Sequence, residues 1–203
     1  MYHFTVPMAL MDFIPVFCFG YAAALLQRDL YDKMRKSHFA LFATGTINIF
    51  AAGFLKALWK LLYAANICDF HALNTMFLPV QSIGFLLAGL GIVLMMTTRK
   101  RVCLAVPPPV FSGSVIFILM MVLGLGSICT VLSIIAVKMK KKGAMALFIA
   151  AFLCSMGMGA MSGQDASLAW VNWIEQSINC VGQGLLMWGV IILSKAGLKE
   201  FTI

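Results

Sequence analysis

The sequence predicts an all-α integral membrane protein with six transmembrane helices, arranged as an inverted repeat of three helices plus three helices. Two features of its composition lead to the class: 62% of the 203 residues are hydrophobic, and only 11% are charged. A soluble domain carries about 25% charged residues. The third observation is a set of short motifs that occur in the same order in both halves of the chain.

Six apolar segments are long enough to cross a hydrocarbon core, which takes roughly 20 residues in a helix. They cover residues 5–26, 39–63, 73–97, 113–137, 144–162 and 168–193. No basic region precedes the first segment and no small-residue cleavage motif follows it, so we expect a retained helix rather than a signal peptide. Because the connections are short, the whole chain is expected to form one membrane domain, residues 1–203.

Within this domain the expected halves are residues 1–101 and 113–203, joined by a Pro-rich linker at 102–112. Each half contains an apolar span, a basic loop, an Ala-Leu-Phe helix and a Gln-Ser-Ile helix. The matching segments are residues 35–36 with 141–142, 40–42 with 146–148, 81–83 with 176–178, and 89–90 with 184–185. Three crossings are an odd number, and the linker is too short for another helical crossing. The second half should therefore enter from the opposite side, as in many secondary transporters.

The formal net charge is +8, and most basic residues gather at the ends of the apolar segments, in residues 28–36, 99–101 and 138–142. Such clusters set orientation and contact anionic lipid headgroups. No aromatic platform of the kind that binds nucleic acid accompanies them. With inverted halves, a cytoplasmic 28–36 loop leaves residues 138–142 on the other side, against the positive-inside tendency. The orientation stays open.

The first three segments each contribute candidate site residues: Asp12 in the first, Asn48 and Lys56 in the second, and Gln81 in the third. An isolated charge at the depth of Lys56 is costly, and Asp12 is its expected partner because both lie near the same membrane face. Lys60, closer to the end of the second segment, is expected to extend to the headgroups.

Pro79, just before Gln81, is expected to kink the third segment. Glycines in the third, fifth and sixth segments are expected to allow close helix packing. They are Gly84, Gly89, Gly91, Gly157, Gly159, Gly163, Gly182, Gly184 and Gly189.

The sixth segment carries the most informative pattern, a carboxylate and four amides whose spacing puts them on one face of a helix. They are Asn172, Glu175, Gln176, Asn179 and Gln183. Unpaired polar groups in lipid cost several kcal/mol each, so this stripe is expected to face protein or water and to line a ligand site. Trp173, close to the stripe, is a candidate wall of that site. In the six-span arrangement the sixth helix starts at the membrane face opposite Lys56, so a direct bond between Glu175 and Lys56 would need helix tilt or intervening water.

No metal site, cofactor or catalytic residue is assigned. The three histidines lie at a terminus or at segment edges, and the six cysteines form no Cys-x-x-Cys pair. The methionines are interpreted as core filling. No nucleotide-binding motif is present.

The favoured function is a small-molecule or ion transporter or channel, or a substrate-binding membrane subunit that works with an energising partner. One alternative is a membrane-embedded lipid-modifying enzyme that uses Asp12 and Glu175, or the loop acids Asp29 and Asp32; a catalytic role is less favoured. The other is a non-catalytic sensor or partner subunit. Expected partners are membrane lipids and a small ligand, with a homo-oligomer left open. The plasma (inner) membrane is the expected location, rather than an internal membrane.

Overall fold

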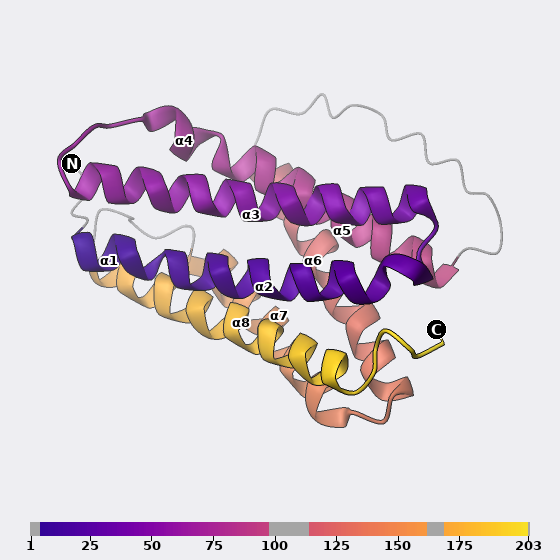
Figure 1. The fold of residues 1–203 in the computed structure, drawn as a ribbon. Coiled ribbons are helices and arrows are strands. Elements are labelled where there is room, and N and C mark those ends of the chain that lie inside the picture. The colour runs from indigo at the N-terminus through magenta and orange to yellow at the C-terminus, as the bar shows by residue number, and fades with distance from the viewer. Residues whose placement is uncertain (1–4, 98–113, 162–168, 203) are drawn as a thin grey trace.

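The computed structural model describes residues 5–97, 114–161 and 169–202, and all regular structure in these ranges is helical (Figure 1). Six spans in these ranges are long and apolar enough to cross a membrane. They are α1 (Val6–Met11) with α2 (Phe13–Leu30) and the 3₁₀ turn η1 (Tyr31–Lys33), α3 (Lys36–Ala64), α4 (His71–Thr75) with α5 (Phe77–Thr97), α6 (Ser114–Lys138), α7 (Lys142–Met161) and α8 (Ala169–Lys195). The six expected spans are confirmed, and the chain is a multi-pass integral membrane protein.

Two of the spans are interrupted at one residue, three positions before a proline, and that residue keeps helical backbone angles. The break between α1 and α2 falls at Asp12, before Pro15, and the break between α4 and α5 falls at Met76, before Pro79. Proline has no N–H and its ring clashes with the carbonyl four residues earlier, so it interrupts the helical ladder at that point. The kink expected from Pro79 is thus present, and both breaks lie at the same end of the bundle (Figure 1).

Glycines bring the backbones of α3 and α5 into direct contact. A Cβ atom added to Gly91 would lie 2.7 Å from the backbone nitrogen of Phe42, and one added to Gly84 would lie 2.9 Å from the carbonyl oxygen of Gly45. The next crossing, of α5 with α6, uses Gly89, where a Cβ would lie 2.8 Å from the Cα of Gly124. In lipid, where the hydrophobic effect does not drive helices together, such close packing is a main source of association.

The glycines of α8 give a divided result. Gly182 lies against Cys154 and Gly189 against Phe148, as expected for helix packing. At three further glycines, Gly157 and Gly159 of α7 and Gly184 of α8, an added Cβ would meet no atom of the described residues within 4 Å, so close packing is not shown there. Gly163 falls outside the described residues.

The two halves run in the same direction along the bundle, so the inverted arrangement is not shown. Arg28 near the end of α2 donates to Ser194 near the end of α8, with 2.8 Å between nitrogen and oxygen, which makes these helices parallel. The packing of Gly182 and Gly189 makes α7 antiparallel to α8. Since α6 and α7 are joined by a tight turn, α6 runs in the same direction as α2 and α8.

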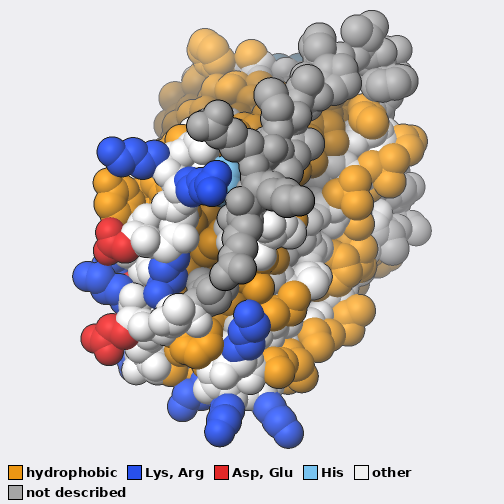
Figure 2. Space-filling model, turned by 90° about the vertical axis from the view of Figure 1, so that its right-hand side faces the viewer, with side chains coloured by type: hydrophobic (Ala, Val, Ile, Leu, Met, Phe, Trp, Pro, Cys, Tyr) orange, Lys and Arg blue, Asp and Glu red, His pale blue; other side chains and the backbone are white. Residues whose placement is uncertain are grey.

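These directions bring basic residues together. Apart from Lys56 and Lys60, every Lys and Arg that the structure describes lies where α2, α5, α6 and α8 end, which we call the basic end (Figure 2). Its members are Arg28, Lys33, Arg35, Lys36, Lys138, Lys140, Lys141, Lys142, Lys195 and Lys199. The basic turns at 31–36 and 138–142 therefore lie at one end rather than at opposite ends. This arrangement agrees with the positive-inside tendency if the basic end is cytoplasmic.

Candidate functional site

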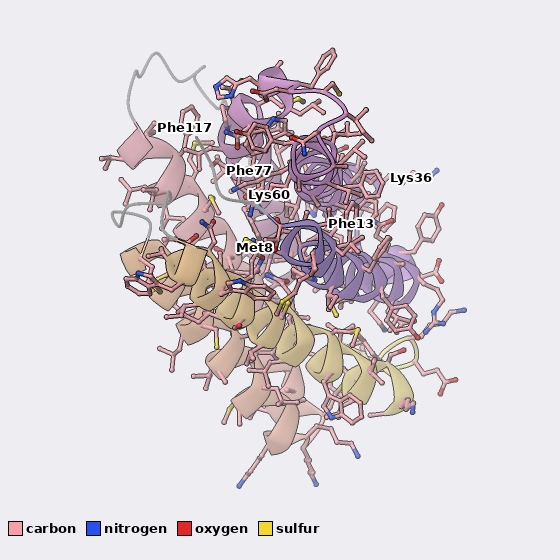
Figure 3. All side chains as sticks on the ribbon, turned by 90° about the vertical axis from the view of Figure 1, so that its left-hand side faces the viewer. Met8, Phe13, Lys36, Lys60, Phe77 and Phe117 are labelled. Atoms are coloured by element: carbon pink, nitrogen blue, oxygen red, sulfur yellow. The ribbon has the colours of Figure 1, made fainter. Side chains whose placement is uncertain are left out.

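The opposite end of the bundle, called the Asp12 end, contains an ion pair inside the membrane-spanning region. Asp12 occupies the break between α1 and α2, and its Oδ2 lies 2.8 Å from Nζ of Lys60 on α3. Each side chain is only 7% exposed. Figure 3 shows Lys60 in the interior, between Met8 of α1 and Phe77 of α5. Removing two ions from water costs several kcal/mol per ion, and the attraction between Asp12 and Lys60 offsets part of that cost.

Lys60 corrects one expectation from the sequence. It does not extend to the headgroups, because a buried carboxylate is within bonding distance. Asp12 was expected to pair with Lys56 instead, and that assignment is wrong. Positions four residues apart on a helix differ by about 40° in direction, and the structure aligns the outer of these two lysines with Asp12.

Lys56 lies one turn deeper and has an aromatic neighbour. Its Nζ is 3.8 Å from the centre of the Phe77 ring, a cation–π contact. It makes no hydrogen bond or ion pair with any residue that the structure describes. Asp12, Lys60 and Glu175 are all within electrostatic range of it. The expected placement of Glu175 at the membrane face opposite Lys56 is wrong, because α8 begins at the Asp12 end. The two side chains still form no ion pair.

The kink in the first span also contacts α8. Pro15 has no N–H with which to bond the carbonyl of Met11, and Cys180 Sγ of α8 lies 3.9 Å from that oxygen. The second carboxylate oxygen of Asp12, Oδ1, is buried without a hydrogen-bond partner among the described residues. The break therefore supplies two acceptor atoms, a carbonyl and a carboxylate oxygen, next to α8.

The polar stripe of α8 is turned toward the bundle. Asn172 is 6% exposed, and the other four members, Glu175, Gln176, Asn179 and Gln183, are half-buried. The other face of α8 is exposed at Val181 and Trp188. Trp173 lies on this exposed face, at 40% exposure, and so does not wall the site with the stripe.

Three amide oxygens in the interior have no hydrogen-bond partner within the described ranges. They are the Oε1 atoms of Gln176 and Gln183 on α8 and of Gln81 on α5. Gln81 and Gln176 begin the two Gln-Ser-Ile segments of the sequence, and the serines after them, Ser82 and Ser177, each donate to the carbonyl four residues earlier. A buried amide oxygen without a partner lacks the hydrogen bond that water would supply. These three oxygens are therefore available to accept hydrogen bonds from a ligand.

Some of the site residues predicted from sequence lie together in the structure, and Asn48 lies apart from them. Asp12, Lys56 and Glu175 come together at the Asp12 end, with the amides of α5 and α8 as further polar groups. Asn48 lies two turns from Lys56 on α3, half-buried and without a hydrogen bond to a described residue. Glu175 likewise has no such hydrogen bond or ion pair.

Lys60 and Phe77 were missed as site residues. Lys60 had a usable signal, since it follows Lys56 by one helical turn and approaches the membrane face at which Asp12 lies. Phe77 had none beyond its position at the start of the third span.

No protein-family model, curated protein or solved structure matches this chain. The arrangement of its own residues therefore carries the functional interpretation.

Proposed function

We propose that the chain is a small-molecule or ion transporter, or the substrate-binding membrane subunit of one, with its ligand held between α3 and α8 at the Asp12 end. One observation carries this proposal: Lys56 and Glu175 have opposite charges, come from different halves and make no ion pair or hydrogen bond with described residues. Unpaired ionic groups inside a membrane are costly and typically mark substrate or ion pathways.

The charge balance of the site supports a particular kind of ligand. The two carboxylates of Asp12 and Glu175 balance the two ammonium groups of Lys56 and Lys60, giving a formal sum of zero. A ligand without net charge preserves this balance. In such a complex an acidic group would bind Lys56 and a basic group would bind Glu175, with the amides supplying hydrogen bonds.

The two helix breaks supply a route for the ligand. The breaks at Asp12 and Met76 lie at the end of the bundle where Lys56 and Lys60 lie on α3. Discontinuous helices surround the binding sites of many secondary transporters, in which access alternates as one bundle of helices moves against the other. In this proposal the segments outside the breaks, α1 and α4, are the moving parts. The two three-helix halves that the sequence predicts each contribute one charge to the ligand.

The test is a thermal-shift screen on the full chain purified in detergent, with amino acids, organic acids, organic cations and inorganic ions as probes. The variants are Lys56→Gln and Glu175→Gln. The matched control is Ser177→Ala, which alters an exposed position two residues from Glu175. A binding compound should raise the melting temperature of the wild type and the control through linkage, with the shift lost in both charge variants. The same compound should then enter proteoliposomes containing wild type and not Lys56→Gln.

Two results would overturn the proposal. A compound that stabilises all four proteins equally does not bind at this site. If no compound shifts the wild type while Glu175→Gln alone lowers the melting temperature, the stripe holds helices together and the transporter function is rejected.

A further inference from the structure

A groove between α6 and α7 lies apart from the ionic site. Its volume is about 470 Å³ and its walls are mainly apolar, with Gly126, Ile134, Ile149 and Phe152 among them. Thr130 and Ile134 of α6 and Ile149 of α7 are exposed, so the groove opens on the outer surface of the bundle. Lys138 lies at its end.

The groove has the depth of one membrane leaflet. From Gly126 to Lys138 a helix advances about 18 Å at 1.5 Å per residue, and half of a typical hydrocarbon core is about 15 Å. The groove therefore extends from near the middle of the bilayer to the basic end. This is the space that one lipid acyl chain occupies when its headgroup lies at the membrane surface.

The mouth of the groove is basic, and its lysines form no ion pair with an acid that the structure describes. Lys140, Lys141 and Lys142 follow Lys138 in the turn, and all four are exposed. No Asp or Glu occurs between residues 70 and 164, so α5, α6 and α7 contribute no acid. Figure 2 shows Lys and Arg side chains at the lower tip of the molecule with no acidic side chain among them. The other basic turn differs, because it contains Asp29 and Asp32.

The backbone of the turn between α6 and α7 has two further features at the mouth of the groove. Three helices finish with the same pair of capping hydrogen bonds and one residue at positive φ: Asn66 (55°), Lys140 (59°) and Gly197 (86°). Glycine or asparagine is usual at that position, and a lysine there is disfavoured by its side chain. Directly after this turn, the N-terminus of α7 presents backbone N–H groups, which favour phosphate.

We infer that the α6–α7 groove binds one anionic phospholipid, with an acyl chain along the groove and the phosphate at Lys138 and the start of α7. The apolar walls of the groove fit the acyl chain of the lipid, and the lysines at its mouth attract the negatively charged headgroup. This inference does not depend on the transport function.

The headgroup is tested by titrating delipidated full-length protein with phosphatidylglycerol or phosphatidylcholine of identical acyl chains and counting bound lipids by native mass spectrometry. A lysine near a membrane surface contributes about fivefold in affinity for an anionic lipid. Phosphatidylglycerol should therefore bind at least about tenfold more tightly than phosphatidylcholine. Lys138→Gln should weaken phosphatidylglycerol binding about fivefold, and the matched control Lys36→Gln, in the other basic turn, should leave it unchanged.

The acyl chain is tested with Thr130→Trp and Ile149→Trp, which fill the groove from exposed positions on its two walls. Each should abolish tight phosphatidylglycerol binding, and water-soluble glycerol phosphate should not compete for the site. Two tryptophan variants are used so that one remains if the other fails to fold, as judged by thermal unfolding. Equal affinity for both lipids, an equal effect of Lys36→Gln and Lys138→Gln, or normal binding by a folded tryptophan variant would each refute the lipid site.

Discussion

Two ion pairs near opposite ends of the first span have the same nitrogen–oxygen distance but differ in how far their side chains are exposed. Asp12 with Lys60 and Arg28 with Asp29 both have 2.8 Å between nitrogen and oxygen. In the first pair both side chains are 7% exposed, whereas in the second Arg28 is 59% exposed and Asp29 is 1% exposed. Arg28 also donates to Ser194 and remains accessible to water or headgroups.

The difference shows that the two ends of the bundle use charge in different ways. At the Asp12 end the ions lie inside, at a helix break, where each needs a protein or ligand partner. At the basic end the cations lie mainly at the surface, where they orient the protein and meet anionic lipid. The site and the determinants of topology are thus separated along the bundle.

The largest expected effect is an all-or-none difference in labelling between the two ends. Cys68 is exposed at the Asp12 end, whereas Asp32 and Lys140 lie in the two turns of the basic end. An impermeant maleimide added to intact cells should label Cys68. Asp32→Cys and Lys140→Cys should be labelled only after permeabilisation, because the positive-inside tendency makes the basic end cytoplasmic. The background for the two engineered cysteines lacks Cys68 and Cys103.

This experiment decides between parallel and inverted halves. In the structure Thr97 lies at the basic end and Ser114 at the Asp12 end, so α5 and α6 run in the same direction. If Lys140→Cys is labelled together with Cys68, the halves are inverted and α6 enters from the other side.

The next largest effect is expected for Asp12→Asn. The substitution removes the buried counter-ion of Lys60, and breaking a buried ion pair from one side costs about 3–5 kcal/mol. Hydrogen bonds between membrane helices contribute only about 0.6 kcal/mol on average. The expected loss is larger here because Asp12 and Lys60 form an ion pair that is excluded from solvent. The free energy of unfolding in mixed micelles measures the loss.

The matched control is the double variant Asp12→Asn with Lys60→Met, which removes both charges. It should recover most of the stability, because apolar replacement of a whole buried pair is often neutral or stabilising. If the double variant is as unstable as Asp12→Asn alone, the pair does not act through charge compensation.

The smallest effect is expected for Arg28→Gln at the basic end. Its loss of unfolding free energy should be smaller than that of Asp12→Asn, since the guanidinium is largely exposed and the buried Asp29 keeps Ser194 and Lys199 as further partners. The loss should also shrink as salt is added, because salt screens exposed charges, whereas the effect of Asp12→Asn should not change. An equal salt dependence of the two variants would contradict the distinction between the ends.

Much of the fold could be predicted from local sequence. Each membrane-spanning helix satisfies its own backbone hydrogen bonds, so apolar length alone located all six spans. Pro79 marked one helix break, and the spacing of the α8 stripe identified its inward face. All of these depend on residues within a few turns of one another.

Only the tertiary structure decided which of these features meet. The choice of Lys60 over Lys56 as the partner of Asp12 depends on how α3 is rotated against the kink. The nearness of Glu175 to Lys56 depends on the direction of α8. Helix rotation and direction are set by packing between distant segments, such as the glycine contacts of α3, α5 and α6. The sequence by itself thus determined the helices and their polar faces, and packing across the bundle determined the site.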